Sequence, residues 1–425
     1  MSSSSPAGRG ADADPEPRTA LVRDLGPTLP ERSLPTALLP LLGRSPLQRH
    51  AVQLARVGVR EMIVLLPEEG DDDLPRVIDA QIDTLPEQAR AEITVRCAPE
   101  ASRAELEEEI TGVYLEVTAH GIYDPRLYRR LADTPGPVRL VDRGDPSGPV
   151  GPIGLAREDG GGDFTEIEVG SLPAYLPSLR RHLRPAWCRI TSPAEGRRAE
   201  WILLDATQKG VLDFPARYLH PAPENVLTRL FAATPITPNQ ITVATGFVGV
   251  FAAWLMATGR YAPALAIALV VNVLDGVDGK LARVKLLASR FGDRLDHILD
   301  VVFEFSWYLG LGWGLSGGGP GPPFVIAVTL IFVMLGTRAM SGIYTLVSGR
   351  QIHDHRRFDR AFRLVAGRRN IYVLLFVAGL VVGRLGAAFE AALAWGITTL
   401  VVYTVRTAVE AWRGRTGGAS GAAAG

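Results

Sequence analysis

The sequence predicts an α/β cytosolic domain followed by an all-α membrane domain of six transmembrane helices. Residues 240–412 contain six apolar runs of roughly bilayer-spanning length, whereas residues 1–235 contain Arg, Asp, Glu and Pro throughout. Across residues 19–205, short β-like runs alternate with helical patterns, which is typical of an α/β domain. The 45 basic and 45 acidic residues balance, so no global field indicates nucleic acid as a partner.

The first half supplies four runs that we expect to form strands. They are residues 61–66, 92–97, 112–117 and 137–142. Helical patterns such as residues 46–58 and 124–133 lie between them, and this rhythm predicts a largely parallel sheet. Both cysteines, Cys97 and Cys188, lie in this half, and we expect them to be reduced because no signal peptide precedes them.

Composition predicts the remaining boundaries. They are a disordered N-terminus (1–18), the α/β domain (19–205), a connector (206–238), the membrane domain (239–412) and a disordered tail (413–425). Within the connector, residues 224–233 are amphipathic, so we expect an interfacial helix along the membrane surface.

The predicted spans and their loops indicate an orientation. The spans are residues 240–258, 261–284, 292–315, 323–347, 370–384 and 388–411. The loop at residues 350–369 carries seven arginines, whereas the loops on the other side carry few. The positive-inside rule therefore predicts that this loop, both termini and the α/β domain are cytoplasmic. Arginine far outnumbers lysine, which is typical of a protein from a GC-rich genome. We therefore expect a bacterial protein, and the spans predict that it is a multi-pass protein of the plasma membrane.

Four aspartates stand out at the second and third spans. Asp275 and Asp278 are three residues apart, and Asp296 and Asp300 are four apart, so each pair occupies one helix face. Two facing helices with two carboxylates each form a cage of oxygen ligands, which hard cations such as Mg²⁺ or Mn²⁺ prefer. No His or Cys stands at ligand spacing, which disfavours zinc.

Carboxylates at membrane depth are costly, about 2.5–3.5 kcal/mol each on insertion scales, so an alternative must be weighed. The aspartates can pair with Arg283, Arg290 or Arg294 and form a proton or ion path. That alternative, a transporter, predicts that bulky replacements of the small residues between the aspartates are tolerated.

The arrangement D-x2-D-G-x2-A-R-x8-G-x3-D-x3-D, from Asp275 to Asp300, resembles the signature of the CDP-alcohol phosphatidyltransferases at every fixed position. The resemblance covers roughly residues 205–412 and includes "TPITPNQIT" at 234–242. It implies a six-helix membrane enzyme that moves a phosphatidyl-type group from a CDP-alcohol lipid to an acceptor hydroxyl and releases CMP. The implied partners are that donor, a small polyol or amino-alcohol acceptor and membrane lipids. Such enzymes are commonly homodimers.

The resemblance also implies roles for individual residues. Asp275, Asp278, Asp296 and Asp300 would bind metal, as two Mg²⁺ or Mn²⁺ ions, and Asp300 would also be the general base. The implied CDP site is Gly279, Ala282, Arg283 and Gly292, with Asn239 and Thr242 as further candidates.

The acceptor is less well indicated. Relatives that use phosphorylated acceptors often have a basic residue after the last Asp, whereas this chain has Val301, so we expect an unphosphorylated acceptor. Arg290, Arg338 and Lys280 are candidates for contacting it. His297 is expected to be a neighbour of the site and not a ligand.

The first domain resembles a sugar-phosphate nucleotidyltransferase in residues 35–66 and 121–131. The family's glycine-rich loop is absent from residues 22–33, and Thr36 stands where the family has Lys. Without these glycines and this lysine the chain lacks the means to hold a triphosphate, so we expect an inactive domain. The alternative is a bifunctional enzyme of the inositol-phospholipid type, whose first domain still makes the CDP-alcohol.

Overall fold

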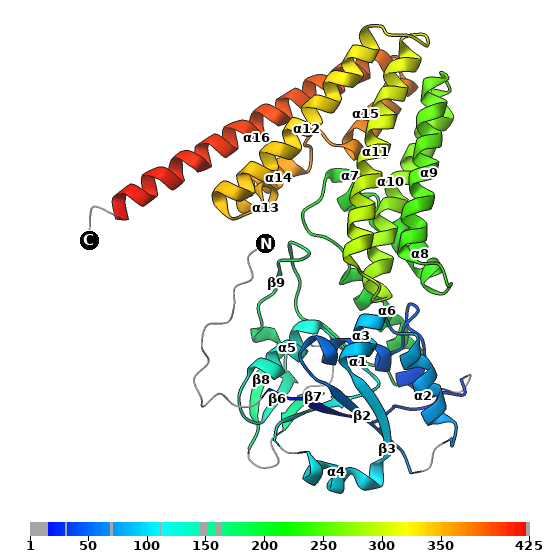
Figure 1. The fold of residues 1–425 in the computed structure, drawn as a ribbon, viewed down its shortest axis with the longest axis vertical. Coiled ribbons are helices and arrows are strands. Elements are labelled where there is room, and N and C mark those ends of the chain that lie inside the picture. The colour runs from blue at the N-terminus through cyan, green and yellow to red at the C-terminus, as the bar shows by residue number, and fades with distance from the viewer. Residues whose placement is uncertain are drawn as a thin grey trace. The chain divides into compact units, whose positions relative to one another are not determined.

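The computed structural model describes residues 16–29, 32–68, 71–110, 112–144, 151–158 and 163–421 (Figure 1). These residues divide into two compact units. The first contains the described residues up to Leu176, His182–Ala206 and Val284–Leu286. The second contains Pro177–Arg181, Thr207–Arg283 and the described residues from Leu287 onward. Most of the predicted disordered N-terminus lies outside the described residues.

The first unit is built on a sheet. The strands of the described chain are β1 (Thr19–Arg23), β2 (Glu61–Leu66), β3 (Thr94–Pro99), β4 (Tyr114–Thr118), β5 (Gly121–Tyr123), β6 (Val138–Asp142), β7 (Gly151–Glu158), β8 (Thr165–Glu168), β9 (Tyr175–Leu176), β10 (Arg181–His182) and β11 (Trp187–Arg189). Seven of them form one sheet in the order β3-β2-β1-β4-β7-β6-β8. All pairs are parallel except those of β7, which is antiparallel to β4 and β6. The four predicted strands are present as β2, β3, β4 and β6.

Helices cover both faces of this sheet. They are α1 (Pro46–Arg56), α2 (Leu74–Asp83), α3 (Glu87–Glu92), α4 (Arg103–Glu109) and α5 (Pro125–Asp133), with 3-10 turns at Thr36–Leu38, Glu100–Ser102 and Val169–Ser171. Helix α6 (Pro193–Asp205) packs instead against the two-stranded sheet of β5 and β11. Alternate residues of β2 enter different cores: Met62 and Val64 pack with α1, whereas Ile63 and Leu65 pack with Leu106 of α4. This period of two fits a strand covered on both faces.

The second unit is helical. Its helices are α7 (Phe214–Tyr218), α8 (Pro221–Ala232), α9 (Pro238–Ala257), α10 (Tyr261–Val284), α11 (Arg290–Leu315), α12 (Pro322–Ser348), α13 (Ile352–His355), α14 (Arg357–Arg363), α15 (Arg369–Val381) and α16 (Leu385–Gly421). The predicted amphipathic segment 224–233 falls in α8, which exposes Val226 and Leu230 while it buries Glu224 and Thr228.

Five of these helices are long and apolar enough to cross a membrane, among the residues described: α9, α10, α11, α12 and α16. The prediction of six spans is therefore met only in part. The fifth predicted span is α15, whose 13 residues extend only about 20 Å, less than the thickness of a bilayer core. The cause is the turn at Gly383, where the backbone adopts a positive φ of 69° directly after the helix.

Close helix packing determines the geometry near the aspartates. A Cβ on Gly249 of α9 would lie 2.4 Å from the Phe303 ring of α11, and one on Gly310 would lie 2.4 Å from the Ala253 carbonyl oxygen. Small residues thus allow α9 and α11 to approach closely, as is common between membrane helices. Helices α12 and α16 also pack along each other (Figure 1).

The C-terminal helix is longer than predicted. Helix α16 continues to Gly421, through most of the segment 413–425 that was expected to be disordered. Arg413 and Arg415 favour a helix, whereas Gly414, Gly417 and Gly418 do not, so composition did not predict that the preceding span continues. Residues 422–425 lie outside the described residues.

Candidate active site

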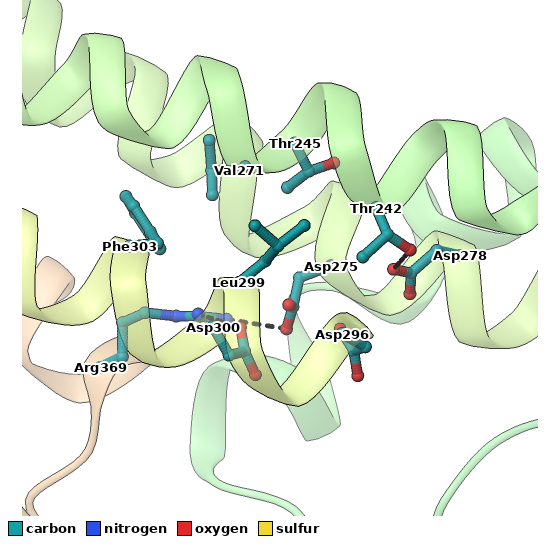
Figure 2. A pocket seen from close by; sticks show the side chains of 11 residues that line it. Thr242, Thr245, Val271, Asp275, Asp278, Asp296, Leu299, Asp300, Phe303 and Arg369 are labelled. Carbon is teal, nitrogen blue, oxygen red and sulfur yellow. Dashed lines mark hydrogen bonds and ion pairs between the residues drawn. The ribbon is translucent and has the colours of Figure 1, made fainter. Parts of the chain in front are cut away.

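A cleft of the second unit contains the aspartates (Figure 2). Helices α9, α10 and α11 and the first residue of α15 supply its lining. The lining residues are Thr242, Thr245, Gly246, Val271, Asp275, Asp278, Asp296, Leu299, Asp300, Phe303 and Arg369. All four aspartates of the sequence signature are among them.

Capping residues determine where α9 and α11 begin. Ser289 caps α11, and its hydroxyl accepts a hydrogen bond from the Gly292 amide at 3.0 Å, which fixes the helix start ahead of Asp296 and Asp300. Thr237 caps α9 in a reciprocal capping box with Gln240. These caps fix where the side chains of both helices enter the cleft.

Three of the four carboxylates converge. Oxygen atoms of Asp275, Asp296 and Asp300 lie within 4.8 Å of one another. Asp278 lines the same cleft, but one of its oxygens accepts a hydrogen bond from the Thr242 hydroxyl at 2.5 Å. The sequence predicted that all four aspartates form one cage. In the structure Asp275, Asp296 and Asp300 form a group of three, and Asp278 is instead hydrogen-bonded to Thr242 of α9.

Arg369, which the sequence analysis did not select, lies in this group. Its Nη1 donates to Asp300 at 2.6 Å and its Nη2 donates to Asp275 at 2.7 Å (Figure 2). Its guanidinium also lies 5.3 Å from the centre of the Phe303 ring. The sequence feature that could have indicated Arg369 is its place at the end of an arginine-rich loop, directly before an apolar segment.

The donor set fits a divalent cation. One guanidinium accompanies four carboxylates in the cleft, so negative charge remains there. Carboxylate oxygens at this spacing are the ligands that Mg²⁺ and Mn²⁺ prefer, and no His or Cys lines the described cleft. Asp275, Asp296 and Asp300 are therefore the residues that would hold the ion, with Asp278 beside them.

Several predicted CDP-site residues lie close to this group. Thr242 lines the cleft, and a Cβ on Gly292 would lie 2.8 Å from the Asn239 side-chain oxygen. A Cβ on Gly279 would lie 3.5 Å from the Arg283 guanidinium. Ala282 is half-buried on the same helix, one turn beyond Asp278. A side chain at Gly292 would therefore clash with Asn239, whereas one at Gly279 would make only an ordinary contact, and the CDP-site roles of these residues stay predictions.

The three acceptor candidates do not line the described cleft. Lys280 is buried, and its ammonium contacts Glu224 at 2.9 Å and Asn225 at 2.7 Å. Arg338 pairs with Glu304 at 2.7 Å, and Arg290 is exposed. Their role in acceptor binding stays a prediction that these contacts do not support. For Lys280 and Arg338 the physical reason is a carboxylate partner, which neutralises each charge.

His297 is not among the residues that line the described cleft. Its side chain is 73% exposed and lies 3.9 Å from Asp293.

Comparisons with known proteins agree with the signature. The family model described as CDP-alcohol phosphatidyltransferase matches residues 235–405. The chain is 31% identical over 171 residues to the inner membrane protein YnjF of Escherichia coli (strain K12), covering 38% of this chain and 80% of that protein. It is 29% identical over 210 residues to a bifunctional IPC transferase and DIPP synthase of Aquifex aeolicus (strain VF5), covering 48% of this chain and 46% of that protein.

The match spans about half the length of the bifunctional relatives. Among solved structures, the Mycobacterium tuberculosis phosphatidylinositol phosphate synthase PgsA1 with CDP-DAG bound aligns with a TM-score of 0.35 at 17% identity. The alignment covers 45% of this chain and 94% of that one. A TM-score of this size does not by itself establish a common fold.

Proposed function

Because this chain belongs to the CDP-alcohol phosphatidyltransferase family, we propose that it transfers a phosphatidyl-type group from a CDP-alcohol lipid, such as CDP-diacylglycerol, to an acceptor alcohol and releases CMP. The observation that carries the proposal is the convergence of Asp275, Asp296 and Asp300 in one cleft. The chain is a multi-pass membrane protein, with five helices suited to spanning. We further propose that α15 completes a six-helix domain and that the active site faces the cytoplasm.

The carboxylates would hold Mg²⁺ or Mn²⁺, as two ions. When bound, these ions neutralise the pyrophosphate and the leaving CMP. Asp275 and Asp296 would serve as ligands from two helices, and the hydrogen bond from Thr242 would orient Asp278. Asp300 would be a ligand and also the general base that takes the proton of the attacking hydroxyl.

The nucleotide end of the donor would lie beside the small residues. Gly279, Ala282 and Gly292 leave room next to the backbone, and Arg283 and Asn239 offer hydrogen bonds there. The transporter alternative gives no reason for small residues at these three positions.

The acceptor that we propose is an unphosphorylated polyol or amino alcohol. Support comes from Val301, which places an apolar side chain directly after Asp300 where a phosphorylated acceptor would favour a basic one.

We propose that the first unit, although nucleotidyltransferase-like in sequence, is catalytically silent. A cavity of about 490 Å³ lies at the carboxyl ends of β1 and β2. Its lining includes the carboxylates of Asp24, Asp71 and Glu100, and the lining Arg23 pairs with Glu116 at 2.6 Å. Such a lining would repel a triphosphate. If the full chain still turned over CTP after the aspartate site was mutated, that result would support the bifunctional alternative.

The test is CMP release by the purified chain in detergent with Mg²⁺ or Mn²⁺ and CDP-diacylglycerol. The acceptors are serine, glycerol, inositol, inositol phosphate and glycerol phosphate. We expect release with one unphosphorylated acceptor and a fall of about 10²–10⁴-fold in Asp300→Asn, because the general base is lost. The matched control is Asp293→Asn, an exposed acid on the same helix.

Each outcome has a distinct meaning. Release with a phosphorylated acceptor alone would contradict the Val301 argument but support the transfer reaction. Equal rates in Asp300→Asn and the unmodified chain would contradict the assigned base. If folded, metal-binding protein neither released CMP nor bound CDP compounds, the transporter alternative would replace the proposal.

A further inference from the structure

The first turn of α15 is held by a carboxylate from a distant segment of the second unit. Asp213 directly precedes α7, and its side chain is only 5% exposed. One of its oxygens caps α7 by accepting a hydrogen bond from the Ala216 amide at 3.2 Å. Its two oxygens also accept hydrogen bonds from the side-chain amide of Asn370 in α15, at 3.0 and 3.2 Å. A single buried carboxylate therefore joins the starts of two helices.

The residue next to Asn370 is the arginine of the aspartate cleft. Arg369 is the first residue of α15, and its guanidinium donates to Asp300 at 2.6 Å and to Asp275 at 2.7 Å (Figure 2). Side-chain directions around a helix are set by its rotation, so a contact that fixes Asn370 also fixes the direction in which Arg369 leaves the first turn. The carboxylate of Asp213 also suits the positive end of the α15 dipole.

Backbone contacts also hold the chain that leads into α15. The Phe214 amide of α7 donates to the Leu364 carbonyl oxygen at 2.8 Å, so α7 contacts this segment through its backbone as well. From α16, the Thr399 hydroxyl accepts a hydrogen bond from the Gly367 amide at 2.8 Å. The approach to α15 is therefore anchored by two helices, and the Asp213 carboxylate extends this anchoring into the first turn.

We propose that Asp213 is a positioning residue of the aspartate site: by holding Asn370, it keeps the Arg369 guanidinium on Asp275 and Asp300. The inference rests on the proposed function, because it takes these carboxylates as ligands of Mg²⁺ or Mn²⁺. Arg369 and the cation compete for the same two carboxylates, so a residue that holds Arg369 in place lowers the affinity for the cation. Asp213 does not line the described cleft, so it acts through Asn370 and Arg369.

The direction of the effect distinguishes positioning from simpler explanations. Loss of Asp213 removes a negative charge from the second unit, and by its field alone that change weakens the binding of a cation. Loss of local structure would also weaken binding, because the carboxylates would no longer converge. Release of Arg369 has the opposite effect, since it frees two carboxylates from charge-assisted hydrogen bonds. Tighter cation binding without Asp213 therefore reports the release of Arg369.

The experiment is a Mn²⁺ titration of the purified full chain in detergent, followed by electron paramagnetic resonance of the free ion. CMP release is measured on the same samples. The variants are Asp213→Ala, Asn370→Ala, Arg369→Gln and the double variant Asp213→Ala/Arg369→Gln. Asp213→Ala and Asn370→Ala should each bind Mn²⁺ about three- to tenfold more tightly, because the hydrogen bonds of Arg369 compete less. The double variant should match Arg369→Gln alone, since Asp213 acts through Arg369.

Two controls separate positioning from the loss of a buried capping acid. Asp213→Asn keeps a side-chain oxygen for the α7 cap and for the Asn370 amide, so its Mn²⁺ affinity should return toward that of the unmodified chain. Asp124→Ala removes a comparable acid from the α/β unit. The side chain of Asp124 is 8% exposed, and it caps α5 by accepting a hydrogen bond from the Arg126 amide at 2.9 Å. This control should leave the Mn²⁺ affinity unchanged.

Unchanged or weaker Mn²⁺ binding in Asp213→Ala and Asn370→Ala overturns the inference. So does a double variant that binds Mn²⁺ more tightly than Arg369→Gln, because Asp213 would then act by another route. If Asp213→Ala does not fold, Asn370→Ala decides, since it leaves the α7 cap intact. CMP release together with unchanged affinities would overturn the inference alone, whereas an unmodified chain that binds no Mn²⁺ would overturn the proposed metal site with it.

Discussion

Two networks of charged side chains share α10, and they differ in balance and in exposure. Lys280 pairs with Glu224 at 2.9 Å and donates to Asn225, and both charged side chains are less than a tenth exposed. The aspartate group has four carboxylates and one guanidinium, and the side chains of Asp275 and Asp300 are each 30% exposed. The first network is neutral and closed, whereas the second is negative and open to a cleft.

The difference separates a structural role from a chemical one. A buried, balanced pair has its charges satisfied by each other, so it ties α8 to α10 and leaves no site for a ligand. An unbalanced group at a cleft retains negative charge that a cation can neutralise. An excess of negative charge at a solvent-accessible cleft, and not burial alone, therefore distinguishes the aspartate group as the functional one.

The largest expected effects on activity are at the aspartates of the open network, among them Asp275. Asp275→Asn removes a metal ligand from the open network, and we expect CMP release to fall by at least about 100-fold because the ion no longer has its ligand set. Initial rates with CDP-diacylglycerol, together with a Mn²⁺ binding titration, would measure it. A rate within a factor of two of the unmodified chain would contradict the proposed ligand role.

Mutation of the closed Lys280–Glu224 network should lower the stability of the protein instead of its activity. Lys280→Met leaves the Glu224 carboxylate buried without its cation, and we expect the free energy of unfolding to fall by about 3–5 kcal/mol. Thermal unfolding in detergent would measure it, with Arg360→Met as a control that breaks a half-exposed pair worth at most about 1 kcal/mol. The double variant Glu224→Met/Lys280→Met should recover most of the loss. A double variant as unstable as the single one would contradict the pairing argument.

The α/β unit buries an ionisable group in a third way, as a neutral side chain with hydrogen-bond partners and no ion pair. His50 is 1% exposed, its ring nitrogens lie 2.5 Å from the Tyr128 hydroxyl and 2.9 Å from the Ala119 carbonyl, and burial lowers its pKa to about 4. The unfolded state thus binds more protons between pH 6.5 and 4. His50 therefore contributes stability that is present above pH 6.5 and lost as the pH falls toward 4, about 3 kcal/mol in full.

Hydrogen exchange of the α1 amides as a function of pH would measure this loss. In His50→Gln the same pH interval should show a smaller decline, whatever the absolute stability of the variant. A decline of equal steepness in both proteins would assign the pH dependence to other groups.

The smallest expected effect concerns Arg369. The Arg369 guanidinium donates to Asp275 and Asp300, and a cation would have to displace these hydrogen bonds. Arg369→Gln should therefore bind Mn²⁺ about tenfold more tightly, since two charge-assisted bonds no longer compete. Electron paramagnetic resonance titration of free Mn²⁺ would measure it without reference to activity. Weaker binding would show that Arg369 instead holds the carboxylates in position.

Periodicity predicted the elements well where a single segment determines them. The four expected strands formed, and the segment 224–233 formed α8. It did not predict β7, which runs antiparallel within the sheet, because strand pairing depends on distant residues. It also overestimated α15, since hydropathy does not reveal a turn at Gly383.

By itself the sequence determined the candidate site to within one helix turn. Spacings of three and four residues place Asp275 with Asp278 and Asp296 with Asp300 on one helix face each, because helical geometry is local. Only the tertiary structure decided which charges meet. It paired Lys280 with Glu224 and brought Arg369 to Asp300. These contacts join residues 56 and 69 positions apart, and helix packing, not local spacing, selects them.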